Sequence, residues 1–144
     1  MHRYWLRDKL FELKQKRQRY KRKFADVDVW NINTWFLDIM PKMLMQLKDE
    51  RYGYPYGMTD DEWERVLGRM IFCFTEANED TCSMKNEYED QLPGILKRDD
   101  LTSVEDQETY NKWFDRAIEI CEHRKKMQDE GLELFKKYFD NLWD

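Results

Sequence analysis

Apolar residues recur every three or four positions along most of the chain, and this spacing is typical of helices that bury one face. The alternating apolar and polar runs that indicate strands are absent from the sequence, and β-branched residues are sparse. We therefore predict an all-α protein, a compact bundle of four to five helices in a single domain over residues 1–144. Its central helix is expected to be kinked by proline, and its C-terminal helix to be long.

The first predicted helix covers residues 3–24 and combines an apolar stripe with a high positive charge. Seven of the ten residues in KQKRQRYKRK, positions 14–23, are basic. Basic side chains near the C-terminus of a helix also interact favourably with its dipole. The stripe, whose leucines we expect to be buried, consists of Leu6, Leu10, Leu13, Tyr20 and Phe24, with Arg17 among them.

The second predicted helix has apolar residues on most sides, which favours a central position. It begins near Asp28, a residue type that caps helix N-termini, and ends before Tyr52 and Gly53. Pro41 lies inside this segment. Because proline lacks an amide proton and clashes with the preceding turn, we expect Pro41 either to kink the helix or to start a new one.

The third predicted helix runs from about residue 60 to at least residue 78. Thr59 and Glu62 have the spacing of a capping box, and Met58 and Trp63 occupy the positions of a hydrophobic staple. Helical spacing persists at Met84, Tyr88 and Leu92, so this helix either continues or restarts after a break near residues 80–83. The last predicted helix begins near Thr102 or Ser103, and Gly131 marks a possible bend. Its late stripe ends close to the chain terminus, and we expect three tryptophans in the core: Trp63, Trp113 and Trp143.

Several separated motifs together resemble a family of small bacteriophage-encoded helical proteins without an established activity. These motifs are Trp30-Asn31, Pro41, Gly53-Tyr54-Pro55, Thr59 with Glu62-Trp63, Met70-Ile71 and the ending EGLELFKKYFDNLWD at 130–144. The resemblance covers residues 28–75 and 130–144. It implies a phage origin and a helical fold, and it implies no reaction.

Charge is unevenly distributed along the chain. Residues 1–24 hold ten Lys or Arg against two Asp or Glu, whereas the chain as a whole has a net charge of −5. The basic N-terminal helix either projects toward an anionic partner or packs on the protein's own acidic surface. No stretch is apolar enough for a signal peptide or a membrane span, and the three cysteines, which we expect to be buried, suit a reducing compartment. We therefore expect a cytoplasmic protein without membrane contact.

Two acidic motifs, EANE at 76–79 and EYED at 87–90, resemble the magnesium-binding pattern of the all-α nucleoside triphosphate pyrophosphohydrolases. In that family, carboxylates on neighbouring helices hold Mg²⁺, which orients the phosphates and a water. Here only seven residues separate the motifs, too few for two facing helices. On one continuous helix, four carboxylates would form an acidic ridge: Glu76, Glu79, Glu87 and Asp90. Two interpretations are open, a solvated surface ridge and a magnesium site.

The remaining metal motifs do not fit. Cys73 and Cys82 are nine residues apart, and Cys121 and His123 flank one residue, whereas structural zinc sites pair ligands more tightly. A di-iron bundle site needs two Glu-x-x-His motifs, and the chain has none. Glu119 and His123 have the spacing of an ordinary surface pair. We therefore predict no cofactor and no metal.

Three tyrosines in the turn GYPYG are left unexplained by helix capping. Tyr52, Tyr54 and Tyr56 cannot all be core residues in a turn, and two interpretations are open. They line the mouth of a pocket whose floor is Trp30 and Trp35, which suits a nucleotide base or a partner's side chain. Alternatively, they seal the end of the preceding helix.

The sequence contains no nucleophile triad and no glycine-rich phosphate loop, so we expect binding rather than catalysis. The leading hypothesis is a phage protein that interferes with a host defence system by occluding a host protein or sequestering a nucleotide signal, as a monomer or a homo-oligomer. A magnesium-dependent nucleotide hydrolase is one alternative. The other is a nucleic-acid-associated accessory protein that makes its contacts through Lys16, Arg17, Arg19, Tyr20, Lys21, Arg22 and Lys23.

Overall fold

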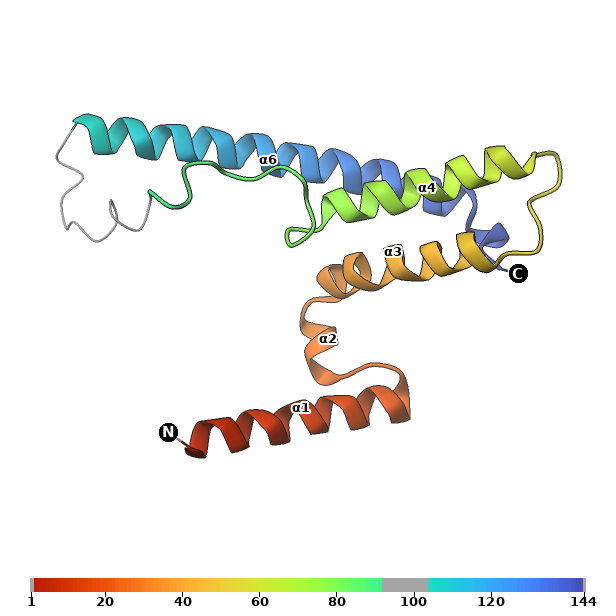
Figure 1. The fold of residues 1–144 in the computed structure, drawn as a ribbon, viewed down its shortest axis with the longest axis horizontal. Helices are drawn as coiled ribbons and strands as arrows, with labels where there is room; N and C mark the ends of the chain where they lie inside the picture. Colours follow the sequence, from red (N-terminus) through yellow and green to blue (C-terminus); the bar gives the residue numbers. More distant parts are fainter. Residues whose placement is uncertain (1, 92–103, 144) are drawn as a thin grey trace. The chain divides into compact units, whose positions relative to one another are not determined.

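The computed structural model describes residues 2–91 and 104–143, with side chains from residue 7 onward. Within these ranges the chain is all-helical and has no strand, which confirms the predicted fold class (Figure 1). Its elements are α1 (His2–Arg22), α2 (Asp26–Trp30), α3 (Ile32–Glu50), α4 (Asp60–Ala77), the long C-terminal α6 (Val104–Lys137) and the short 3₁₀ helix η1 (Phe139–Asn141). The predicted start of the last helix at Thr102 or Ser103 lies outside the described residues, as do Leu92 and the side chains of His2 and Leu6.

The chain divides into two compact units, Met1–Ile39 and Met40–Asp144. In the first unit, a sharp corner joins α1 to α2. Lys23, at φ 70°, ends α1 in the left-handed conformation that commonly follows a helix C-terminus. Gln18 then clamps the start of α2, because its side chain donates to Asp26 Oδ2 at 2.7 Å and accepts from the Asp26 amide at 3.0 Å. Asp28 completes the corner by pairing with Arg19 at 2.6 Å.

Three sequence-based expectations for the first unit are wrong. Asp28 does not cap the central helix; it lies inside α2, where its carboxylate accepts from the Ala25 amide at 2.7 Å. The second predicted helix is interrupted at Asn31, between α2 and α3. Helix α3 then runs through Pro41 into the second unit, so Pro41 starts no new helix, and a kink there stays a prediction. Leu10 and Leu13, expected to be buried, are each about 60% exposed.

The second unit is built on the packing of α4 against α6. The apolar face of α4 is fully buried around Leu67, Met70 and Phe74, and Met127 is the buried apolar residue of α6. Edge-to-face aromatic contacts extend this core toward the C-terminus, with Trp63 against Tyr138 at 5.5 Å and Phe74 against Phe135 at 6.1 Å between ring centroids. On the rim of the interface, Arg69 forms a bidentate ion pair with Glu130, at 2.6 and 2.7 Å.

Gly131 has a packing role in α6, and the predicted bend at this position stays a prediction. Helix α6 continues through it to Lys137. A Cβ atom at this position would lie 2.8 Å from Phe74 Cε1 and 3.1 Å from Cys73 Cβ. The absence of a side chain therefore lets α4 and α6 approach closely at this point.

The start of α4 matches its prediction. The Thr59 hydroxyl accepts from the Glu62 amide at 3.3 Å, and the Glu62 carboxylate accepts from the Thr59 amide at 2.8 Å. The end of α4 does not: the helix stops at Ala77, and residues 79–91 form turns rather than a continuing or restarting helix. This segment runs along α6 (Figure 1), to which it is tied by Trp113 Nε1 donating to Glu89 and by Arg116 pairing with Glu87.

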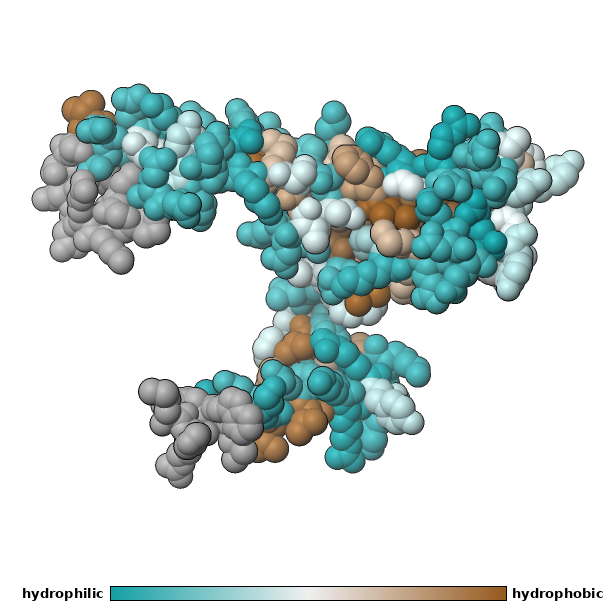
Figure 2. Space-filling view, in the orientation of Figure 1, coloured by the Kyte–Doolittle hydropathy of each residue, from teal (hydrophilic) through white to brown (hydrophobic). Residues whose placement is uncertain are grey.

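Aromatic and aliphatic side chains remain exposed in both units. Trp143, expected in the core, is 74% exposed, whereas Trp63 is buried as predicted and Trp113 is half-buried. Apolar atoms are visible at the surface of the first unit, around α1 and α2 (Figure 2). The larger apolar side chains exposed on that unit are Leu10, Phe11, Leu13, Phe24, Val29, Trp30, Ile32 and Trp35.

Candidate functional site

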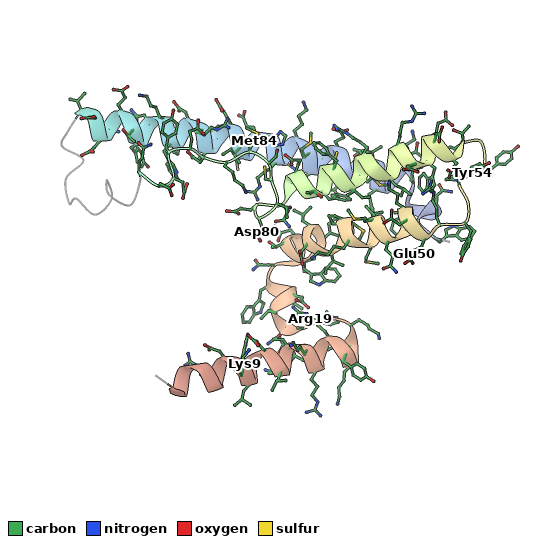
Figure 3. The ribbon with its side chains drawn as sticks, in the orientation of Figure 1. Lys9, Arg19, Glu50, Tyr54, Asp80 and Met84 are labelled. Carbon is green, nitrogen blue, oxygen red and sulfur yellow. The ribbon has the colours of Figure 1, made fainter. Side chains whose placement is uncertain are left out.

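An aromatic hollow lies beside the turn between α3 and α4, where Tyr54 is marked in Figure 3. It has a volume of about 310 Å³, which is at the lower end of small-molecule sites. Aromatic rings dominate its lining, and Asn141 contributes an amide that can both donate and accept a hydrogen bond. The lining residues are Tyr52, Gly53, Tyr54, Pro55, Trp63, Asn141 and Trp143.

The hollow joins two segments that are far apart in the sequence. Tyr52 and Tyr54 follow α3, whereas Trp143 comes from the C-terminal segment after η1. Trp63 forms part of the wall while its ring is held edge-on against Tyr138. The site therefore depends on the packed second unit rather than on the turn alone.

The tight turn at residues 55–58 accounts for part of GYPYG. The Met58 amide donates to the Pro55 carbonyl at 3.1 Å, and Gly57 has φ +85°. A positive φ at the third position is the requirement of a type II turn, which glycine meets without strain. Arg51 fixes the other end of the connection by pairing with Asp60 at 2.8 Å and Glu64 at 3.3 Å.

The tyrosines do not seal the end of α3. Tyr52 is 97% exposed, Tyr54 is 55% exposed, and Tyr56 is fully exposed. Tyr52 and Tyr54 line the hollow, whereas Tyr56 does not. The predicted floor is also different, because Trp63 and Trp143 line the hollow, whereas Trp30 and Trp35 belong to the first unit and are exposed.

Part of the predicted basic surface on α1 is used in contacts within the first unit. Lys14 and Arg22 pair with Asp26, and Arg19 pairs with Asp28. These contacts show that part of the basic helix serves the α1–α2 corner. Arg19 also lowers the pKa of Asp28. Four further cations make no ion pair within the described residues and surround the 85% exposed Tyr20: Lys16, Arg17, Lys21 and Lys23.

The predicted acidic ridge is not formed. Glu76 is in the last turn of α4, whereas Glu87 and Asp90 lie in the non-helical segment along α6. Two of the four carboxylates are engaged by cations of α6, because Glu79 pairs with Arg124 at 3.5 Å and Glu87 with Arg116 at 3.1 Å. Glu76 is buried and contacts Ser83 and His123. The structure thus does not assemble the predicted magnesium ligands.

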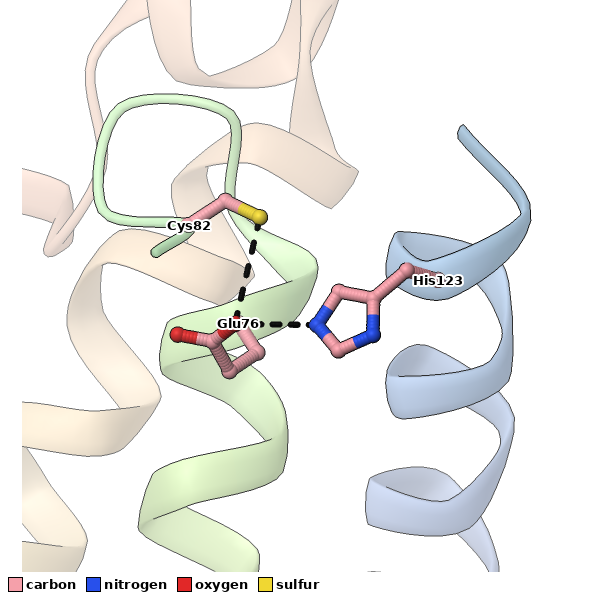
Figure 4. A group of neighbouring side chains, drawn as sticks. All are labelled: Glu76, Cys82 and His123. Carbon is pink, nitrogen blue, oxygen red and sulfur yellow. Dashed lines mark hydrogen bonds and ion pairs between the residues drawn. The ribbon is translucent and has the colours of Figure 1, made fainter. Parts of the chain in front are cut away.

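The structure instead brings Glu76 together with Cys82 and His123, as Figure 4 shows. Their potential ligand atoms all lie within 4.8 Å of one another. Glu76 Oε2 is 2.9 Å from His123 Nε2 and 3.9 Å from Cys82 Sγ. Glu76 and Cys82 are buried, and His123 is partly exposed. His123 therefore does not form the expected surface pair with Glu119, which binds Arg116 at 2.8 Å.

A short loop after α4 places the cysteine in this cluster. The amides of Thr81 and Cys82 donate to the Asn78 carbonyl at 3.3 and 2.8 Å, and the Asn78 side chain accepts from the Asp80 amide at 3.0 Å. Ser83 then donates to Glu76 through both its amide, at 3.1 Å, and its hydroxyl, at 2.7 Å. The loop folds back over the helix end and turns the Cys82 sulfur inward.

Hydrogen bonding keeps Glu76 ionised in this buried position. Burial alone would raise the pKa of Glu76, because a carboxylate is less stable away from water. Hydrogen bonds from Ser83 and His123 to the carboxylate outweigh this effect and place its pKa below the ordinary value. The cluster is therefore centred on a negative charge.

Sequence reasoning missed this cluster because its members are separated along the chain. Glu76 and His123 are 47 residues apart, and they meet only through the packing of α4 on α6. Cysteine and histidine motifs with short spacings are recognisable in a sequence, whereas this grouping gives no such signal. The expectation that every cysteine is buried is also wrong, because Cys121 is exposed.

The chain matches none of the protein-family models, curated proteins or solved structures with which it was compared. The resemblance to phage proteins therefore stays a prediction. Among the helices within the described residues, none has the length and apolar character needed to cross a membrane.

Proposed function

We propose that this protein acts by binding another protein, without catalysis, and that the aromatic hollow is its recognition site. The observation that carries this proposal is the lining of the hollow, in which two tyrosines and two tryptophans surround a space of about 310 Å³. Tyrosine and tryptophan are the residues most enriched at the energetic centres of protein interfaces. A planar or proline side chain of the partner fits this setting.

The lining favours a protein partner over a free nucleotide. Aromatic rings can stack on a base, but nucleotide phosphates also need cations or a cluster of amide donors. None of the described residues that line the hollow is a lysine or an arginine. The lining residues that the structure describes also include no carboxylate, histidine or cysteine, which supports a role without acid–base or nucleophilic chemistry.

The resemblance to phage proteins predicts that the partner is a host protein. Occlusion of a host protein of a defence system then follows from tight binding alone, because a bound protein blocks the surface that it covers. The motif resemblance supports this part of the proposal.

The test is capture of the partner with the tagged full-length chain, identification by mass spectrometry, and titration calorimetry against Tyr54→Ala and Trp143→Ala. Truncation of a buried aromatic anchor costs about 2 kcal/mol or more, roughly a thirtyfold loss of affinity. Tyr56→Ala is the matched control, because Tyr56 belongs to the same turn but does not line the hollow.

We expect Tyr56→Ala to bind within about threefold of the wild type, and all three variants to keep its melting temperature. Equal affinities for all variants would contradict the assignment of the hollow. Recovery of a small nucleotide in place of a protein, seen as absorbance near 260 nm, would contradict the protein partner.

Nucleic-acid contact through α1 is the second candidate. Three cations of this helix, Lys16, Arg17 and Lys21, and Lys23 directly after it make no ion pair within the described residues. They lie within four residues of the exposed Tyr20, a combination that suits phosphate contacts and stacking on a base. The remaining basic residues of the segment serve the α1–α2 corner. Gel-shift measurements with single-stranded DNA test this candidate directly.

A further inference from the structure

We infer that Glu76, Cys82 and His123 form a zinc-binding site with its fourth coordination position open to solvent. A carboxylate oxygen, a sulfur and an imidazole nitrogen converge here from the end of α4, the following loop and α6 (Figure 4). Two of the three side chains are buried, so the site lies within the packed second unit rather than on an acidic surface.

The distances suit a tetrahedral ion after small side-chain movements. Zinc bonds to oxygen, nitrogen and sulfur are about 2.0–2.3 Å long, which puts neighbouring ligands of a tetrahedron roughly 3.3–3.6 Å apart. The observed separations are 2.9 Å between Glu76 Oε2 and His123 Nε2 and 3.9 Å between Glu76 Oε2 and Cys82 Sγ. No pair of the three ligand atoms exceeds 4.8 Å. Side-chain rotations that move the ligand atoms by a few tenths of an ångström to about one ångström would bring these separations to the tetrahedral values.

The donor set selects the class of metal. Calcium and magnesium prefer oxygen ligands, and this site offers only one carboxylate. A thiolate with an imidazole and a carboxylate suits zinc, and sites with three protein ligands leave one position for water or another small ligand. His123, with its side chain 28% exposed, is the ligand that solvent reaches, so we expect the fourth position on its side of the cluster.

Hydrogen bonding to Glu76 alone does not explain why Cys82 lies in this cluster. The Glu76 carboxylate already accepts from the Ser83 amide, the Ser83 hydroxyl and His123. A thiol is a weak donor and adds little to such a group, but as a thiolate it is a strong zinc ligand. On binding, the Cys82 thiol releases its proton to solvent. The proton on His123 Nε2 is released or moves to Nδ1, which frees Nε2 as a ligand, and zinc replaces the direct contact between His123 and Glu76.

Ser83 is suited to orient the carboxylate in the loaded site. Its amide donates to Glu76 Oε1 at 3.1 Å, the oxygen that does not contact His123. This bond persists when Oε2 turns to the metal, and such support of a ligand by an outer hydrogen bond is a common feature of metal sites.

The test is titration of the full-length, reduced and metal-free chain with Co²⁺, followed by competition with Zn²⁺. We expect one equivalent of Co²⁺ to give the near-ultraviolet absorption of a thiolate–cobalt bond, and Zn²⁺ to abolish it. Cys82→Ala should lose this absorption, and His123→Ala should weaken binding more than tenfold. Cys121→Ala is the matched control, because this exposed cysteine lies two residues before His123 and should leave the spectrum unchanged.

Circular dichroism of each metal-free variant shows whether it is folded. If Cys82→Ala fails to fold, the partly exposed His123 gives the deciding variant, together with Glu76→Gln. Absence of stoichiometric cobalt binding by the wild type would overturn the site. Loss of the cobalt absorption in Cys121→Ala would also overturn the site. So would an absorption that survives in both Cys82→Ala and His123→Ala.

Discussion

At the scale of single residues, Gly131 shows how one missing side chain sets the distance between two helices. Replacement by alanine brings a Cβ atom to 2.8 Å from the Phe74 ring, which is shorter than real Cβ contacts. We expect Gly131→Ala to destabilise the protein by about 1–3 kcal/mol, the usual cost of overpacking a core. Gly68→Ala is the control, because its Cβ meets nothing within 4 Å and alanine favours a helix interior by about 0.5–1 kcal/mol.

Chemical denaturation of the three proteins checks this expectation. The two alanines should shift the midpoint in opposite directions, Gly131→Ala downward and Gly68→Ala upward. A Gly131→Ala midpoint equal to that of the wild type would show that α4 and α6 separate without cost.

Glu76 predicts how stability depends on pH. The folded pKa of Glu76 lies below its ordinary value of 4.5, so the folded protein holds the charged form more strongly than the unfolded chain does. This contribution is complete above that ordinary value and is lost as the pH falls through the lower folded pKa. We expect the stability advantage of the wild type over Glu76→Gln to shrink on acidification from pH 6 to pH 3.

The free energy of unfolding of the wild type and of Glu76→Gln is measured by chemical denaturation at several pH values over this range, with EDTA present to remove metal. Glu122→Gln is the control, because Glu122 is exposed on α6 and makes no ion pair within the described residues. Its difference from the wild type should stay constant over the same range. A constant difference for Glu76→Gln as well would contradict the link between this carboxylate and acid stability.

At the scale of elements, the capping box predicted from the sequence at the N-terminus of α4 is present in the structure, and its contribution to stability can be measured. Thr59→Ala removes the acceptor of the Glu62 amide and should destabilise the fold by about 1 kcal/mol. Thr34→Ala, on an exposed face of α3, should change stability by less than half of that. Thermal unfolding followed by circular dichroism measures both, and equal midpoints for wild type and Thr59→Ala would remove the cap as a source of stability.

Local patterns were predictable because the physics that produces them is local. The all-helical class follows from spacing, and the capping box follows from two residues three positions apart. Packing between helices is not local, and it determines where α4 ends and which side chains are buried. Met84 and Tyr88 have helical spacing, yet they are half-buried in a non-helical segment that runs along α6 (Figure 1).

The candidate sites show the same division. The tyrosines of the turn were predictable as exposed rings, because a turn cannot bury all three. Their partners in the hollow were not, since Trp143 joins them only through the folded C-terminal segment. The Glu76, Cys82 and His123 group depends on the packing of α4 against α6 and on a non-helical loop, neither of which has a spacing signature.

At the scale of the whole molecule, the uneven charge has a structural counterpart. The unit Met1–Ile39 holds ten Lys or Arg against five Asp or Glu, whereas the rest of the chain is acidic. Three of the basic residues are used within the α1–α2 corner. The sequence left open whether this segment binds an external anion or the protein's own carboxylates, and the structure shows the second for that part of it.

The second candidate function gives a quantitative prediction for the remaining cations of this segment, Lys16, Arg17 and Lys21 of α1 and Lys23 directly after it. Binding of single-stranded DNA weakens with salt by about 0.7 logarithmic units per phosphate contact and per tenfold change in salt, so four contacts give a slope of roughly −3. Arg17→Ala combined with Lys21→Ala should reduce its magnitude by about 1.4, whereas Lys136→Ala on α6 should not change it. Fluorescence anisotropy at several salt concentrations gives the slopes. Identical slopes for the double variant and the wild type would exclude α1 as the phosphate-binding element.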